Sequence, residues 1–158
     1  MRIELEILDR TNYDIARKIN RDDIPEAFVG ETEELIETME YGAEHHLKGY
    51  GFLIKADGEY AGYLMIGEAL PWPTDPPEMK EKDYYRLMFF VIDKAYRSQG
   101  IGGKAMEMAM EKTCRQFGKC PVVLGCHKDN AGAEKFYLKN GFRKTTYMEG
   151  NDHYMLRE

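Results

Sequence analysis

The fold of this chain is decided by the stretch Arg97-Ser98-Gln99-Gly100-Ile101-Gly102-Gly103. It follows an apolar run that ends near Ile92 and opens a long segment with helical spacing of its apolar residues. Where a strand leads through a glycine loop into a helix, free backbone N–H groups and the positive end of the helix dipole point at the same place. The stretch therefore predicts an α/β fold with an anion-binding turn.

Two other kinds of phosphate-binding loop do not match this spacing. A dinucleotide-binding loop needs a third glycine, but Gly100 and Gly102 are followed by Ala105 and Met106. A nucleoside triphosphate loop needs Gly-Lys-Ser/Thr, and the residue after Lys104 is an alanine. A turn with a purely structural role would need neither the positive charge of Arg97 nor the side-chain amide of Gln99. A turn that binds an anion is therefore favoured.

The segments around this loop alternate between strand and helix patterns. Their order is one strand, two helices, three strands, a helix, a strand, a helix and two strands, which predicts a mixed-sheet α/β domain spanning residues 1–158. The predicted strands are 3–7, 50–56, 60–66, 84–92, 121–126, 142–148 and 153–157, and the predicted helices are 11–19, 31–46, 100–117 and 130–139.

Residues 84–92 are the best candidate for the central strand, because apolar residues occupy both of its faces. Strict alternation would place one set of side chains on one face and the intervening set on the other. The first set is Leu87, Phe89 and Val91, and the second is Met88, Phe90 and Ile92.

Composition excludes several classes of protein. Hydrophobic residues make up 43% and charged residues 32% of the 158 residues, as expected for a globular chain. The net charge of −6 argues against binding to nucleic acid, which normally needs a basic face. No segment is apolar enough to span a membrane. The histidines lack metal-ligand spacing, and Cys114, Cys120 and Cys126 form no CxxC pair, so we expect no metal site and a reducing, cytoplasmic location.

A second motif follows the glycine loop. Asn130-Ala131-Gly132-Ala133-Glu134-Lys135-Phe136-Tyr137-Leu138-Lys139-Asn140-Gly141-Phe142 resembles the Asn-x-x-Ala-x-x-Phe-Tyr helix, ending in Gly-Phe, of the GNAT superfamily of N-acetyltransferases. Residues 97–102 resemble the pyrophosphate-binding motif of the same family, and the order of elements agrees over nearly the whole chain. The resemblance implies a mixed, mostly antiparallel sheet of about seven strands flanked by helices, and transfer of an acetyl group from acetyl-coenzyme A to an amine.

The resemblance also implies where coenzyme A binds. Backbone amides from Gln99 to Lys104 would hold its pyrophosphate, and the end of the central strand would pair with the pantetheine like an added strand. Asn130 would contact the pantetheine arm. The implied cofactor-binding residues are Phe90, Ile92, Arg97, Ser98, Gln99, Gly100, Ile101, Gly102, Gly103, Lys104, Asn130, Ala133, Phe136 and Tyr137.

Tyr137 is the candidate catalytic residue, since the departing thiolate needs a proton and the resemblance places this side chain near the sulfur. The base that deprotonates the amine stays open. Some members of the family carry a glutamate on the central strand, at a position that is Met88 here. The remaining candidates are Glu68, Tyr84 and Asp83, and burial of the amine would make a dedicated base unnecessary.

The expected acceptor is the primary amine of a small molecule, such as a polyamine, an aminoglycoside or an amino-acid derivative. The segment 69–83 carries four of the six prolines and the only tryptophan, and we expect it to wall the acceptor pocket. Glu68, Trp72 and Tyr84 are accordingly the candidate substrate residues. The alternatives are a protein or peptide N-acetyltransferase, which would need a more open loop, and a non-catalytic acyl-coenzyme A sensor, in which Tyr137 would be dispensable. The C-terminal hairpin suits a homodimer contact.

Overall fold

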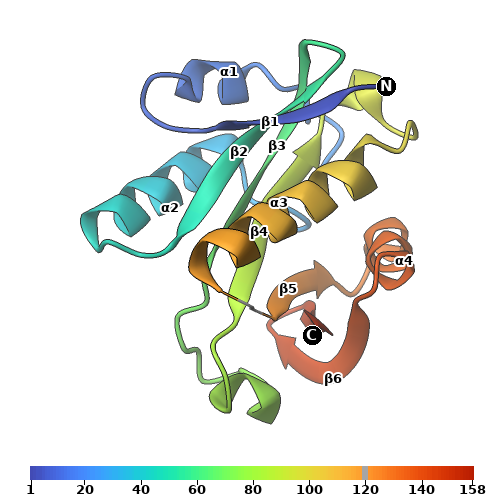
Figure 1. Ribbon diagram of the computed structural model, residues 1–158. Coiled ribbons are helices and arrows are strands. Elements are labelled where there is room, and N and C mark those ends of the chain that lie inside the picture. The colour runs from blue at the N-terminus through green and yellow to red at the C-terminus, as the bar shows by residue number, and fades with distance from the viewer. Residues whose placement is uncertain (119–120) are drawn as a thin grey trace.

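A seven-stranded sheet forms the centre of the molecule in the computed structural model, which describes residues 1–118 and 121–158 (Figure 1). The strands are β1 (Ile3–Ile7), β2 (Gly49–Ala56), β3 (Glu59–Glu68), β4 (Tyr85–Ile92), β5 (Val122–His127), β6 (Arg143–Glu149) and β7 (Asp152–Arg157). The α-helices are α1 (Tyr13–Arg17), α2 (Thr32–Glu44), α3 (Ile101–Phe117) and α4 (Ala131–Lys139). Short 3-10 helices cover Pro77–Lys80 and Lys94–Tyr96.

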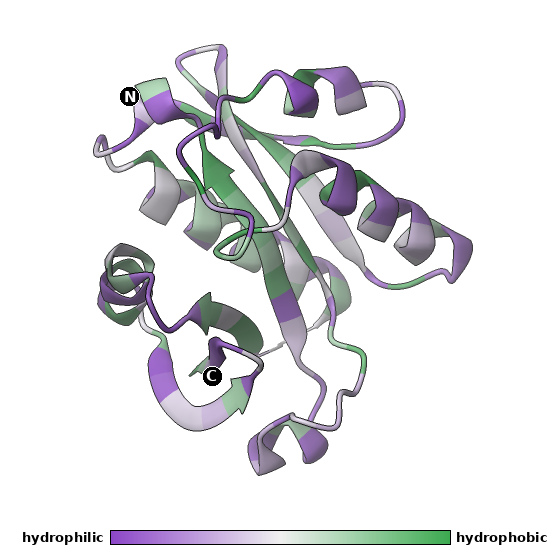
Figure 2. Ribbon diagram, turned by 180° about the vertical axis from the view of Figure 1, so that it is seen from behind, coloured by the Kyte–Doolittle hydropathy of each residue, from purple (hydrophilic) through white to green (hydrophobic). Residues whose placement is uncertain are grey.

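The strand order is β1-β2-β3-β4-β5-β7-β6. Only β4 and β5 form a parallel pair among the described residues, and the other neighbouring strands are antiparallel. One hydrophobic cluster joins the sheet to α3 and α4, and a second joins its other face to α1 and α2. Figure 2 shows hydrophobic residues concentrated in the central strands. The predicted mixed α/β fold is confirmed.

Local sequence signals explain most of the element boundaries. The turn Asp57-Gly58 joins β2 to β3 as predicted, with both residues at positive φ (50° and 84°), as a tight hairpin requires. Asn130 caps α4 by accepting the Ala133 N–H at 3.2 Å. Asn12 does not cap α1 in this way, because its side chain accepts the N–H three residues before it. The helix predicted to run to Ile19 is shorter in the structure, where α1 holds five residues and ends at Arg17.

Strand β4 contains a β-bulge at Phe89. Met88 pairs with Met65, whereas Val91 pairs with Tyr63, so β4 holds one residue more than β3 between these two pairs. Phe89 has a φ of 54°, which is rare for a bulky residue and marks the extra position.

The bulge changes which side chains share a face. Leu87 packs in the α3-side cluster together with Phe90 and Ile92, whereas Phe89 packs with Val91 in the cluster beneath α1 and α2. The predicted grouping of Leu87, Phe89 and Val91 on one face is therefore wrong. One inserted residue shifts the period of two, so every side chain after the bulge moves to the opposite face.

The parallel strands β4 and β5 part soon after they meet. Their pairing is limited to Tyr85 with Val122 and Arg86 with Val123. Beyond these pairs β4 stays with β3 while β5 stays with β7, and Figure 1 shows the two strands diverging. The N–H and C=O groups of β4 that face β5 after Arg86 consequently have no strand partner.

Gly62 allows β3 to approach the bulged strand closely. A Cβ at Gly62 would lie 2.3 Å from the Val91 carbonyl oxygen and 3.1 Å from the Ile92 Cα, and both of these are backbone atoms. We therefore expect Gly62→Ala to lower the free energy of unfolding by about 2 kcal/mol or more. Urea denaturation would measure this change.

The matched control is Gly42→Ala in α2, where a Cβ meets nothing within 4 Å. This substitution should raise stability by about 1 kcal/mol, because glycine disfavours a helix interior. Equal unfolding midpoints for the two variants would contradict the role given to Gly62.

In the part of the chain that the structure describes, no helix is long and apolar enough to cross a membrane. Cys114 and Cys126 are not joined by a disulfide there, and Cys120 lies outside the described residues.

Candidate active site

Two connected cavities occupy the opening between β4 and β5. The large cavity, about 870 Å³, extends along the start of α3, the side of α4 and the end of β4. The central pocket, about 270 Å³, lies between β4, β5, the β6–β7 hairpin and the loop before α2. The residues that line both cavities are Phe28, Val29, Phe90, Asn130, Ala133 and Tyr137.

The glycine loop forms one end of the large cavity. Gly100 has a φ of 79° and directly precedes α3, so the first N–H groups of that helix have no partner within it. Gly102 presents no side chain to the cavity, and a Cβ there would approach Phe136 and Phe90 to 3.5 and 3.6 Å. The turn therefore leaves backbone donors accessible beside an aromatic wall.

Almost all the residues predicted to bind coenzyme A lie together in this cavity. Those that line it are Phe90, Ile92, Arg97, Ser98, Gly100, Ile101, Gly102, Gly103, Asn130, Ala133, Phe136 and Tyr137. Gln99 and Lys104 are exposed and do not line it, and the Gln99 side chain reaches the Ala95 carbonyl at 3.5 Å.

Arg97 holds the loop in place. Its Nε donates to the Ile92 carbonyl at 2.9 Å, and one terminal nitrogen pairs with Asp23. This pairing lowers the pKa of Asp23. The remaining terminal nitrogen is buried without a hydrogen-bond partner among the described residues. The sequence predicted a cation on the loop, and in the structure Arg97 uses its Nε and one terminal nitrogen within the protein itself.

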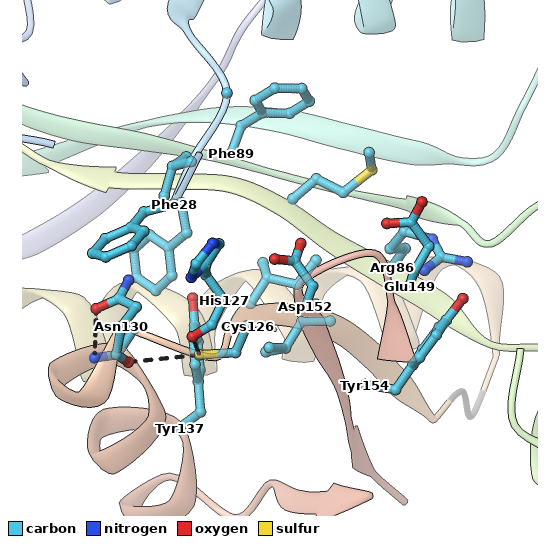
Figure 3. Close-up of a pocket in the computed structure, with 18 of the residues that line it drawn as sticks. Phe28, Arg86, Phe89, Cys126, His127, Asn130, Tyr137, Glu149, Asp152 and Tyr154 are labelled. Carbon is cyan, nitrogen blue, oxygen red and sulfur yellow. Dashed lines mark hydrogen bonds between the residues drawn. The ribbon is translucent and has the colours of Figure 1, made fainter. Parts of the chain in front are cut away.

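Tyr137 lies where the two cavities meet. Its ring contacts Phe136 and Phe142 edge-on, with centroids 5.3 and 5.7 Å apart, and Figure 3 shows it rising from α4 beside Cys126. Burial, followed by the charge of Cys126, raises the pKa of Tyr137. Burial likewise raises the pKa of the Cys126 thiol to about 11. The Tyr137 hydroxyl thus stays protonated, and a thiolate in the same surroundings is a strong proton acceptor.

His127 supplies a hydrogen-bond donor to the central pocket. Its Nδ1 accepts the Asp129 N–H at 3.1 Å, so the neutral ring carries its proton on Nε2. The ring packs against Phe28 at a centroid distance of 5.0 Å. In this tautomer Nε2 has no lone pair to take a proton, and His127 is a donor rather than a base.

Carboxylates from three separate elements line the central pocket within the described chain: Glu34 of α2, Glu149 of β6 and Asp152 of β7. Asp152 faces His127 across the β5–β7 pair, and burial raises its pKa. The pKa of Glu34 is raised mainly by its hydrogen bond with Glu26. Nothing local in the sequence marked Glu149 or Asp152, because only the long-range pairing of the hairpin with β5 brings them here.

A buried arginine closes one side of the central pocket. The Arg86 guanidinium lies 3.7 Å from the centroid of the Trp72 ring and 3.7 Å from the Asp75 carboxylate. Tyr154 donates to the same carboxylate at 3.0 Å and is 2.7 Å from the Thr74 hydroxyl. Burial lowers the pKa of Arg86. The structure thus places Trp72 on the pocket wall, and no signal in the sequence indicated that Arg86 lines the pocket.

The structure does not bring the other substrate and base candidates to this pocket. Glu68, Asp83 and Tyr84 line a separate hollow beneath the proline-rich segment, at the end of β3 and the start of β4. Glu68 accepts the Lys48 N–H at 2.8 Å, and the Tyr84 hydroxyl is buried without a hydrogen-bond partner in the described regions. The central pocket opens farther along β4, so these residues lie away from Tyr137. Met88 lines the pocket, where a strand carboxylate would have faced it.

Parallel strands that part beside a phosphate-binding turn admit a slender acyl carrier, whose phosphates rest on the turn while its acyl end reaches the gap. The fold and the site together place the chain among the acyl-coenzyme A-dependent transferases.

The sequence model of the Acetyltransferase (GNAT) family matches residues 13–142, and the chain belongs to this family. It is an acetyltransferase, and acetyl-coenzyme A is its acetyl donor. No curated protein matches the chain by sequence.

Several solved structures share the fold. The aminoglycoside acetyltransferase AAC(6')-Ib in complex with coenzyme A is 16% identical with a TM-score of 0.73, covering 99% of this chain and 94% of that one. The PaiA N-acetyltransferase from Thermoplasma acidophilum in complex with coenzyme A is 19% identical with a TM-score of 0.67, covering 100% and 99%. An acetyltransferase from Salmonella typhimurium that modifies the N-terminal serine of ribosomal protein L7/L12 is 17% identical with a TM-score of 0.68, covering 98% and 91%. At these identities the likeness shows the fold alone.

The large cavity fits acetyl-coenzyme A. The free N–H groups at the start of α3 and the side-chain-free surface at Gly102 suit the pyrophosphate. Phe90 and Phe136 offer apolar contact to the pantetheine, and the unpaired side of β4 offers backbone hydrogen bonds. Among the residues that the structure describes, no group of three or more His, Cys, Asp or Glu side chains is arranged to hold a metal ion.

Proposed function

We propose that the chain is an N-acetyltransferase that modifies the primary amine of a small molecule bound in the central pocket. The observation that carries this proposal is the acidic lining of that pocket by Glu34, Glu149 and Asp152. Carboxylates attract the ammonium form in which an amine arrives, and a pocket of about 270 Å³ suits a small acceptor better than a polypeptide.

Each of the three side chains nearest the reaction has a separate task. When bound, acetyl-coenzyme A supplies a thioester that reacts with the neutral amine. Asp152 accepts the proton of the ammonium group, because burial raises its pKa and makes its carboxylate a better base. His127 lines the pocket and presents its Nε2–H there as a hydrogen-bond donor. Tyr137 donates its hydroxyl proton to the sulfur, and the N–H groups of β4 that face β5 polarise the carbonyl.

The function is tested by thiol release from acetyl-coenzyme A over a panel that contains alkylamines, a polyamine, an aminoglycoside, an amino-acid amide and a peptide with a free N-terminus. Acetylation of small amines, identified by mass spectrometry of the product, is the expected result. Turnover of the peptide alone would favour a protein acetyltransferase. Binding of coenzyme A without turnover of any acceptor would favour a sensor.

Replacing Asp152 with asparagine should lower kcat/KM for the amine about tenfold at neutral pH, at the low end of what a general base contributes. Only the ionised carboxylate accepts a proton. The wild-type protein should therefore lose activity as the pH falls through the raised pKa of Asp152. The variant must bind an amine that is already neutral, and its activity should rise toward alkaline pH. The pH dependence of kcat/KM measures this shift. Glu149→Gln is the control, since Glu149 lines the same pocket but is exposed; equal profiles for the two variants would contradict the role of Asp152.

A further inference from the structure

A further cavity, which we call the apolar groove, adjoins the central pocket. It has a volume of about 350 Å³ and lies beneath the C-terminal half of α2, over the start of β2 and the end of β3. Its strand surface includes three glycines and its walls include three methionines: Gly49, Gly51, Gly67, Met39, Met65 and Met88. Methionine side chains adapt their shape to apolar ligands, and the Met39 side chain lies directly over Gly51.

Exposed apolar side chains gather at this groove. Four large ones that remain 39% to 47% exposed all line it: Ile7, Tyr41, Leu70 and Trp72. Elsewhere in the described chain, the comparably exposed large hydrophobic residues are Met1, Leu138 and Tyr147, none of which lines a cavity described above. Exposed apolar residues scattered singly are ordinary, whereas a concave cluster indicates a binding surface.

The groove is continuous with the acceptor side of the active site. Trp72, Arg86 and Met88 line both the groove and the central pocket. The groove and the large cavity share no lining residue. A molecule that enters the groove from the active site is therefore the acceptor and not the acetyl donor.

The charged residues of the groove disfavour an acceptor that carries a second positive charge in it. Among the described residues that line it, the only carboxylate is Glu68, and one of its oxygens already accepts the Lys48 N–H at 2.8 Å. Lys48 and Arg86 also line the groove, so a second ammonium group, as in a polyamine, would lose its hydration beside two cations and a single carboxylate that already accepts a hydrogen bond. The central pocket, with its three carboxylates, suits one ammonium group, whereas the groove suits an uncharged hydrocarbon group.

We propose that the apolar groove binds the hydrocarbon part of the acceptor, so that the substrate is a primary amine carrying an alkyl or arylalkyl chain. This inference rests on the proposed function. The hydrocarbon chain of the acceptor would cross β4 beside Trp72. The Trp72 ring is held against Arg86, and the Trp72 backbone N–H donates to Asp75 at 2.9 Å. Trp72 and Leu70 are then specificity-determining residues, and they touch the remote end of the acceptor rather than its reacting amine.

The test compares primary n-alkylamines from ethylamine to octylamine with α,ω-diamines of the same length, at saturating acetyl-coenzyme A. For the monoamines we expect kcat/KM to rise about fourfold with each methylene that enters the groove. For the diamines we expect no such rise. Thiol release measures both series.

Leu70→Ser should lower kcat/KM for octylamine about tenfold and leave ethylamine unchanged, because a partly exposed leucine loses part of its burial energy. Leu138→Ser is the matched control, since Leu138 is a similarly exposed leucine outside the groove, and it should change neither substrate. Both side chains are exposed, so neither substitution threatens the core.

The possible outcomes separate the two proposals. Acetylation of amines with no dependence on chain length would overturn the groove assignment and leave the proposed function standing. Acetylation of none of the amines would overturn the proposed function as well. A dimer in sedimentation velocity that Leu70→Ser converts to monomer would show that a second copy covers the groove, and the assignment would be wrong.

Discussion

Gly100→Asp should weaken the binding of coenzyme A about a hundredfold, whereas Gly100→Asn should weaken it only severalfold. Gly100 has a φ of 79°, in the left-handed region that asparagine and aspartate enter more readily than other residues. A Cβ at this position meets nothing within 4 Å, so neither side chain is excluded by crowding. The two variants share shape and backbone cost, and they differ by one negative charge at the proposed pyrophosphate site.

Coulomb repulsion sets the size of this difference. Two unit charges 4 Å apart repel by about 4 kcal/mol at the effective dielectric of a protein surface, and screening by salt reduces this value. A hundredfold loss corresponds to about 2.7 kcal/mol. Isothermal titration calorimetry with coenzyme A would measure it, and the gap between the variants should narrow as salt is added. Equal affinities for the aspartate and asparagine variants would place the pyrophosphate elsewhere.

Tyr137→Phe should lower kcat about a hundredfold and change KM for acetyl-coenzyme A less than threefold, since general acids contribute about 10²- to 10⁴-fold to rate. The substitution keeps the ring that contacts Phe136 and Phe142 and removes only the hydroxyl. Because burial raises the pKa of Tyr137, the wild-type hydroxyl keeps its proton into the alkaline range, and we expect no basic loss of activity from it near neutral pH.

Steady-state kinetics with a saturating amine would separate the two parameters. Tyr147→Phe is the control, because Tyr147 is 41% exposed on β6 and lines none of the active-site cavities. An unchanged kcat in Tyr137→Phe would remove the acid role. A fall in kcat together with a large rise in KM would indicate that the hydroxyl binds the donor instead.

Local signals in the sequence were enough to predict most of the fold. The Asp57-Gly58 turn, the cap at Asn130 and the glycine loop each depend on residues within a few positions of one another, and the structure has them where the sequence indicated. The bulge at Phe89 could not be predicted from local sequence signals. It depends on how β4 meets β3, and the sequence of β4 itself shows only apolar residues.

The residues of the candidate site also fall into two groups: those that local sequence motifs indicated, and those that only long-range strand pairing brings together. Most of the predicted residues that line the large cavity come from two contiguous motifs, so the resemblance of these motifs was enough to gather them. The residues of the central pocket come from many separate segments: the loop before α2, α2 itself, the proline-rich segment, β4, β5, α4 and the C-terminal hairpin. Asp152 and Arg86 are separated by 66 positions in the chain, and only the sheet order brings their strands to one pocket. The base candidates from the sequence, Glu68, Asp83 and Tyr84, lie instead in the hollow at the end of β3 and the start of β4.

The parting of β4 from β5 also bears on how this protein avoids aggregation. An unpaired strand edge on the outside of a sheet invites strands of other molecules to add to it. Here the edge without a strand partner lies between β4 and β5, in the interior of the sheet and not on one of its two outer strands. The protein therefore keeps one free edge for a slender ligand while hiding it from its neighbours in a crowded solution.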